Sequence, residues 1–110
     1  MNDPLVRKHE LALRDLEEQS DYLESHANPR TALRFLRAAE RTFEFLARMP
    51  LAGEEYSTDI PALAGLRRFR ISGFENHIIY YRPAEGAIEV IRIVHGARDA
   101  RSVLGEQETK

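Results

Sequence analysis

The chain of 110 residues is long enough for one domain with one hydrophobic core, and 43% of its residues are hydrophobic. It contains no cysteine, which excludes a disulfide framework, a thiolate metal site and a cysteine nucleophile. Its net charge of −2 at pH 7 weighs against strong binding of nucleic acid by the chain alone, because neutralising phosphates requires excess lysine and arginine. We expect a single domain over residues 1–110.

The sequence also lacks signals for a membrane or a cofactor. No apolar run approaches the length of a membrane span, and the first four residues lack the basic and apolar regions of a signal peptide. We therefore expect a cytoplasmic protein with no membrane partner. The four histidines do not have the spacing of a metal site, and no glycine-rich phosphate motif occurs, so we expect no metal and no cofactor.

The first half of the chain is predicted to form a short strand and a helix hairpin. Residues 5–8 have the length of an edge strand, and an amphipathic helical pattern begins at about Glu10. A second helix is predicted to begin at Asn28 and Pro29, which suit the cap and the first helical position, and to end at Met49. Helices joined by so short a link pack as an antiparallel hairpin.

The second half is predicted to form a loop and a small sheet. Residues 51–65 contain glycines and a proline that break any periodicity, so they are expected to form a loop. Three strands follow, within residues 66–74, 77–82 and 88–95, and a short helical turn is expected near Asp99 to Leu104. The fold class is thus α+β: an N-terminal strand, an antiparallel helix hairpin packed on a small antiparallel meander sheet, and a short C-terminal helix.

Arg92 interrupts an apolar face of the third strand, where alternation places Ile88, Val90 and Val94 together. A buried arginine needs a carboxylate partner. Either a glutamate of the hairpin, such as Glu17 or Glu40, pairs with it, or this face is open to solvent.

Several motifs in order resemble the RelE/ParE superfamily, the toxins of bacterial type II toxin–antitoxin systems. They are Asp15-Leu16-Glu17-Glu18 with Tyr22, Pro29, Arg34-Phe35, Leu46, Pro50, Leu66-Arg67 and His95-Gly96-Ala97-Arg98-Asp99. The order and spacing are most similar to the ParE-like branch. The resemblance implies that the helix hairpin covers one face of the sheet, while the other face is concave and open.

The superfamily has two main activities. RelE-like members cut messenger RNA on the ribosome, whereas ParE-like members are described as poisoning DNA gyrase. A nuclease would draw on His95 and Arg98 with Arg70 and Arg82, although His77 and Leu104 stand where the RelE-like pattern has an arginine and a tyrosine.

Direct binding of gyrase, with no catalytic residue, is the leading hypothesis. A ribosome-dependent endoribonuclease and a non-toxic binding module in an antitoxin repressor complex remain as alternatives. The resemblance also implies a cognate antitoxin and a hetero-oligomer with it.

Two sets of residues are candidates for these interactions. Candidates for binding the target are Arg68, Arg70, Arg92, His95, Arg98 and Arg101. Candidates for binding the antitoxin are Leu13, Leu16, Phe43 and Tyr81, of which Leu13 and Phe43 are expected to be exposed on the hairpin. His95 could equally have a structural role as a histidine in a turn. Arg98 could likewise form only a local ion pair with Asp99.

Overall fold

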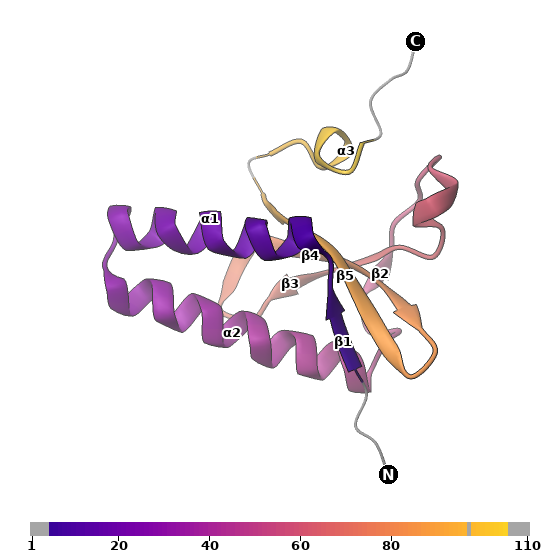
Figure 1. The fold of residues 1–110 in the computed structure, drawn as a ribbon, viewed down its shortest axis with the longest axis horizontal. Helices are drawn as coiled ribbons and strands as arrows, with labels where there is room; N and C mark the ends of the chain where they lie inside the picture. Colours follow the sequence, from indigo (N-terminus) through magenta and orange to yellow (C-terminus); the bar gives the residue numbers. More distant parts are fainter. Residues whose placement is uncertain (1–4, 97, 106–110) are drawn as a thin grey trace.

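A computed structural model describes residues 5–96 and 98–105. Figure 1 shows a helix hairpin lying beside a twisted sheet, with a small C-terminal helix apart from the hairpin. In chain order the elements are β1 (Leu5–Lys8), α1 (Glu10–His26), α2 (Pro29–Arg48), β2 (Glu54–Glu55), η1 (Pro61–Leu63), β3 (Arg67–Ile71), β4 (Phe74–Ala84), β5 (Ala87–His95) and α3 (Ala100–Val103). The α+β prediction is confirmed.

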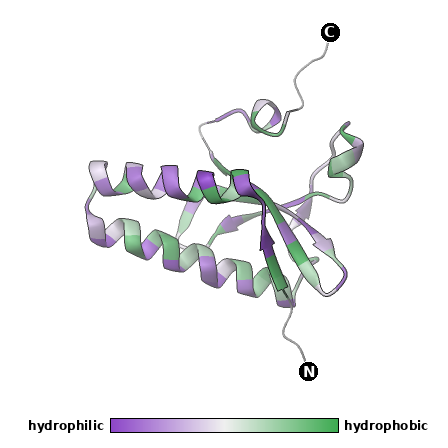
Figure 2. Ribbon diagram, viewed as in Figure 1, coloured by the Kyte–Doolittle hydropathy of each residue, from purple (hydrophilic) through white to green (hydrophobic). Residues whose placement is uncertain are grey.

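The two helices begin and end where the sequence predicts. Asn28 caps α2, because its Oδ1 accepts a hydrogen bond of 2.7 Å from the backbone N–H of Thr31. Pro29 occupies the first turn, where its missing N–H is not needed. Hydrophilic and hydrophobic residues alternate along both helices, as in amphipathic helices that bury one side (Figure 2). No described helix is long and apolar enough to cross a membrane.

The sheet has five strands in the order β1-β5-β4-β3-β2. The meander of β3, β4 and β5 is antiparallel as predicted. Three features differ from the sequence prediction. β1 joins the sheet in parallel with β5, which makes the sheet mixed, and the two-residue strand β2 pairs with β3 from within the expected loop. β4 is also longer than predicted, because it begins at Phe74 and extends to Ala84.

A β-bulge in β5 changes which residues face the helices. Tyr80 pairs with Arg92 and Tyr81 with Val90, so Ile91 is an extra residue. Val90 and Ile93 belong to the core beneath the hairpin, whereas Ile91 belongs to a cluster on the other face of the sheet. The expected regular alternation over residues 88–95 is therefore wrong, because the bulge shifts its phase by one residue.

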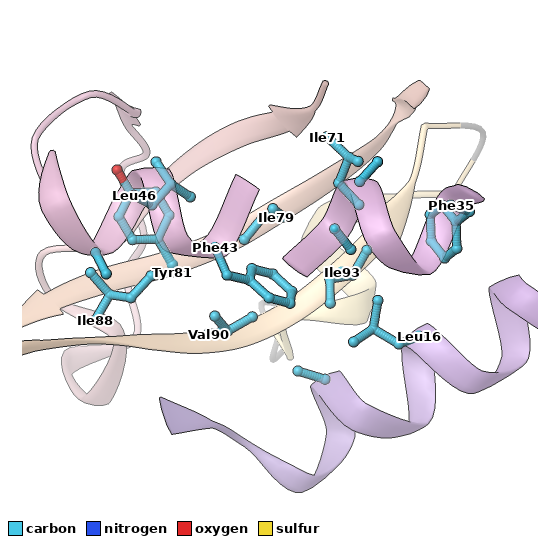
Figure 3. Packing of buried hydrophobic residues seen from close by; sticks show 14 residues of the cluster. Leu16, Phe35, Phe43, Leu46, Ile71, Ile79, Tyr81, Ile88, Val90 and Ile93 are labelled. Atoms are coloured by element: carbon cyan, nitrogen blue, oxygen red, sulfur yellow. The ribbon is translucent and has the colours of Figure 1, made fainter. Parts of the chain in front are cut away.

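The main core lies between the helix hairpin and the sheet. Figure 3 shows its largest side chains, with Phe43 of α2 directed toward Ile79 and Val90. Phe43 and Tyr81 are fully buried and Leu16 is 7% exposed, so the proposal that these three contact an antitoxin needs correction. They fill the core because the hydrophobic stripes of both helices face the sheet. Leu13, with half of its surface exposed, is the only one of the four candidates that is accessible.

The face of the sheet opposite the hairpin is not fully open, whereas the resemblance implied a concave and open face there. A second cluster consists of Leu66, Tyr80, Ile91, Val94 and Leu104. Leu63 of η1 and Val103 of α3 pack against this cluster. The segment before β3 and the C-terminal helix thus cover part of this face and shield its apolar side chains from water.

Candidate functional site

A cavity of about 350 Å³ lies where α1 meets the ends of β4 and β5, and we call it the α1–β5 pocket. Each of its walls comes from a different part of the chain. The lining residues are Asp15, Glu18, Gln19, Tyr22, His77, Arg92, Ile93, Val94, His95, Arg98 and Val103.

The pocket exists because β1 ends before β5 does. Pairing between the two strands stops at Lys8 and Val90, and the chain then turns into α1. Beyond this point, side chains of α1 form hydrogen bonds with the backbone groups at the unpaired edge of β5. Asp15 Oδ2 accepts a hydrogen bond of 2.9 Å from the backbone N–H of Ile93, and Gln19 Nε2 donates one of 2.9 Å to the backbone oxygen of Ile93. The two side chains replace a neighbouring strand.

Asp15 is also the carboxylate partner of Arg92. The guanidinium donates from Nε to Oδ2 at 2.7 Å and from Nη2 to Oδ1 at 2.9 Å, a bidentate arrangement. The expected partners Glu17 and Glu40 are therefore wrong. Hydrogen bonding to Asp15 raises the pKa of Arg92. Arg92 Nη1 also donates to the backbone oxygen of Val103 at 2.9 Å, so this arginine connects α1 to α3.

His77 forms the buried floor of the pocket. Its Nδ1 lies 2.8 Å from Gln19 Oε1, and because that amide oxygen can only accept, Nδ1 carries the proton. Burial, with a smaller contribution from the neighbouring His95, lowers the pKa of His77 to about 4. The ring centroids of His77 and His95 are 5.0 Å apart. His77 is therefore neutral at pH 7 and does not add positive charge to the pocket.

The accessible charges of the pocket are few. Arg92 is neutralised by Asp15, which leaves Glu18 and Arg98, both exposed, at its margin. Tyr22 is 58% exposed and stacks on His26, with ring centroids 3.9 Å apart. Together with Val94 and Val103 these groups form a hollow with apolar walls and charged margins. Such a hollow suits a side chain of a protein partner.

The structure brings together three of the predicted target-binding residues: Arg92, His95 and Arg98 line the same pocket. Arg101 lies on α3 and is exposed. Asp99 is not in an ion pair with Arg98 in the described part of the chain. It caps α3 instead, since its carboxylate accepts from the backbone N–H of Arg101 and from Ser102 Oγ.

The remaining predicted arginines lie elsewhere on the sheet. Arg68 and Arg70 line a separate hollow beside β2. Arg68 contacts Glu54 at 3.3 Å, and hydrogen bonding to Tyr80 and Glu54 raises its pKa. Arg70 Nη1 donates to the backbone oxygen of Glu75 at 2.7 Å.

Arg82 is held at the other end of the sheet. Its Nε donates to Glu89 Oε1 at 2.8 Å, and its Nη1 donates to the backbone oxygen of Ala62. The hydrogen bond from Arg82 lowers the pKa of Glu89. Arg70 and Arg82 thus have intramolecular partners and line neither side of the α1–β5 pocket.

Asp15, Gln19 and His77 are the polar residues of the pocket interior that the sequence prediction did not assign to a site. The available signal was the position of Asp15 and Gln19 four residues apart within α1, which places them on one side of the helix. Within residues 5–96 and 98–105, no group of three or more histidines and carboxylates is placed to hold a metal ion.

Comparison with known families decides the affiliation. Residues 6–100 match the family model described as the ParE toxin of the type II toxin–antitoxin system parDE. The chain belongs to the ParE toxin family. A search of curated proteins found no match.

Two solved structures share the ParE-type fold. One is described as the chromosomal ParDE toxin–antitoxin system from P. aeruginosa, with a TM-score of 0.67 and 17% identity over 84% of this chain and 95% of that chain. The other is the toxin–antitoxin complex RelBE2 from Mycobacterium tuberculosis, with a TM-score of 0.58 and 25% identity over 89% of this chain and 97% of that chain. At 17% identity the first likeness shows the fold alone.

Proposed function

We propose that this ParE-family chain inhibits DNA gyrase by direct binding and performs no chemistry of its own. The observation that carries the proposal is the separation of the residues that a nuclease would combine. His95 and Arg98 lie at the α1–β5 pocket, whereas Arg70 and Arg82 lie outside it and are held by Glu75 and Glu89.

Cleavage of RNA needs a proton acceptor, a proton donor and cations around the same phosphate. In the pocket, Arg92 is already paired with Asp15, and His77 is buried and neutral. Only Arg98 remains as an accessible cation of the lining beside His95. This arrangement supports binding of a protein surface better than it supports phosphoryl transfer.

The proposed contact with gyrase includes the rim of the pocket and the start of α3. Arg98 and Arg101 are exposed there, and arginines are frequent anchors of protein interfaces. The apolar hollow between them and Tyr22 provides a place for one side chain of the target.

A cognate antitoxin is the second proposed partner, because the two solved structures with this fold are described as toxin–antitoxin systems or complexes. The outer side of the helix hairpin offers accessible apolar residues for it, namely Leu13 and Leu33. An antitoxin segment that covers them would form a hetero-oligomer with this chain.

The proposal is tested with purified gyrase in a supercoiling assay, beside a ribosome-programmed cleavage assay of messenger RNA. We expect the chain to inhibit supercoiling and to leave the RNA intact. Arg98→Glu should weaken inhibition at least tenfold, while Arg14→Glu, an equal change of charge on exposed α1, should not. Cleaved RNA with normal supercoiling would instead establish the nuclease alternative, which the proximity of His95 and Arg98 favours. No effect in either assay would leave the binding-module alternative.

A further inference from the structure

The outer side of α2 carries five arginines in one line, away from the α1–β5 pocket. With about 100° of rotation per residue, all five lie within a sector of about 60° on the helix. All are exposed, whereas the opposite side of the helix carries the buried residues Phe35, Phe43 and Leu46. We call this line the arginine ridge. It consists of Arg30, Arg34, Arg37, Arg41 and Arg48.

The arginines of the ridge differ from those of the sheet, which have partners within the molecule. Arg67, Arg68, Arg82 and Arg92 each contact a carboxylate within the molecule. No arginine of the ridge forms an ion pair or a side-chain hydrogen bond with any residue in the ranges 5–96 and 98–105. The guanidinium groups are therefore available to an external anion.

Charge is separated between the two helices of the hairpin. The outer side of α1 carries the exposed carboxylates Glu10, Glu17, Asp21 and Glu24. On α2, Glu40 turns toward Lys8 of β1 at 3.3 Å, and Glu44 is the one acidic residue beside the ridge. The net charge of −2 thus hides a strip of concentrated positive charge. At 1.5 Å per residue, this strip is about 27 Å long.

The shape of the ridge identifies the kind of anion. It runs along the outside of a straight helix, and the hollows described above are lined by other residues. Leu33 and Phe45 are exposed beside the ridge, but neither lines one of these hollows, and a docked peptide gains most of its affinity from apolar anchors in pockets. A row of guanidinium groups instead suits a row of phosphates, to which arginine binds in a bidentate manner. We propose that the arginine ridge binds the phosphate backbone of double-stranded DNA.

The choice of DNA rests on the proposed function, because gyrase acts on DNA and a toxin bound to it lies near the duplex. The contact carries no base recognition, since every group of the ridge is a cation on a helix surface. By itself this contact is weak, because the carboxylates on the neighbouring helix α1 repel the phosphates of DNA. When the chain is bound to gyrase, the same contact adds to the affinity through a high local concentration of DNA.

The test measures binding of the purified chain to a labelled DNA duplex of about 20 base pairs by fluorescence anisotropy, at salt concentrations from about 50 to 200 mM. The ridge variant is Arg34→Gln with Arg37→Gln. The matched control is Arg7→Gln with Arg14→Gln, which changes the net charge equally at exposed positions outside the ridge. Glutamine has a helix propensity similar to that of arginine, which covers the three helical positions. Arg7 lies in β1 with its side chain 52% exposed and only a long contact of 3.8 Å to Glu89, so both variants should fold.

We expect the ridge variant to bind DNA about tenfold more weakly, with a salt dependence reduced by one to two ions, and the control to bind as the unmodified chain does. Equal losses in both variants, or no binding by the unmodified chain at the lowest salt, would overturn the proposal. Displacement of DNA by polyglutamate at equal charge would assign the ridge to an acidic protein instead. Inhibition of gyrase by the unmodified chain is measured separately and tests the proposed function. A failure of the proposed function is therefore distinguishable from a failure of DNA binding by the ridge.

Discussion

Asp15 of α1 accepts three hydrogen bonds, two from the guanidinium of Arg92 and one from the backbone N–H of Ile93. The side chains of Asp15 and Arg92 are only 8% and 19% exposed. The pair fixes α1 against the edge of β5 and, through Arg92, holds α3. Removing one member of such a pair leaves the other charge without compensation in a place that water reaches poorly.

Asp15→Asn should therefore destabilise the chain by about 2–4 kcal/mol, because asparagine retains the shape of aspartate but cannot neutralise Arg92. Urea denaturation followed by circular dichroism measures this change. Glu17→Gln is the control, since it removes one negative charge from an exposed position on the same helix and should cost less than about 0.5 kcal/mol. Similar values for the two variants would contradict a stabilising role for the pair.

His77 should make the stability of the chain depend on pH. Its pKa is about 4 in the folded chain, against about 6.5 in an unfolded chain, so the unfolded state takes up a proton first as the pH falls. The contribution of neutral His77 is complete above pH 6.5 and is lost between pH 6.5 and pH 4. Between pH 7 and pH 4.5 this loss is on the order of 2 kcal/mol.

Chemical denaturation of the unmodified chain and of His77→Gln at both pH values measures the effect. As the pH falls, the unfolding free energy of the unmodified chain should decrease more than that of His77→Gln. His26→Gln, at an exposed position of α1, should retain the pH dependence of the unmodified chain. A difference that is constant with pH would show that His77 does not account for the dependence.

Gly53→Ala should destabilise the chain by about 2–3 kcal/mol. A Cβ atom at Gly53 would lie 2.5 Å from the hydroxyl oxygen of Tyr81 and 2.8 Å from the backbone oxygen of Arg68. The same hydroxyl accepts a hydrogen bond from the N–H of Gly53 and donates one to the backbone oxygen of Pro50. Because Tyr81→Phe removes part of the clash, the double variant should cost less than the sum of the single variants in thermal denaturation. Additive costs would contradict this contact.

Leu13→Ala and Phe43→Ala should separate partner binding from stability. Phe43 is fully buried, so its truncation should cost about 3–5 kcal/mol. Leu13 is half exposed, so its truncation should cost less than about 1 kcal/mol. Calorimetric titration with the antitoxin should nevertheless show weaker binding by Leu13→Ala. Unchanged binding would exclude Leu13 from the proposed interface.

The helices could be predicted from the sequence because their signals are local. The apolar spacing and the Asn28-Pro29 start depend only on neighbouring residues, and the structure has α2 beginning at Pro29. The mixed sheet was harder to predict from the sequence, since the parallel pairing of β1 with β5 joins segments that are distant in the chain. The bulge at Ile91 is set by the register of β4 against β5, which the alternation within one strand does not reveal.

The site was predictable only in part for the same reason. The motif that contains His95 and Arg98 marked one wall of the pocket, because it is continuous in sequence. The partner of Arg92 was not predictable, since several carboxylates of the hairpin were suitable by charge. Asp15 is the partner because β1 ends at Lys8 and brings this turn of α1 against the free edge of β5.

The parallel pairing of β1 with β5 also bears on when the toxin becomes complete. The first strand made during synthesis must wait for the last strand before it can form its hydrogen bonds in the sheet, whereas the hydrogen bonds within the two helices are local. The α1–β5 pocket is then completed late, since β5 supplies one of its walls. A nascent chain therefore has an early helix hairpin but no finished pocket, so any contact that uses the pocket has to wait until β5 has been made.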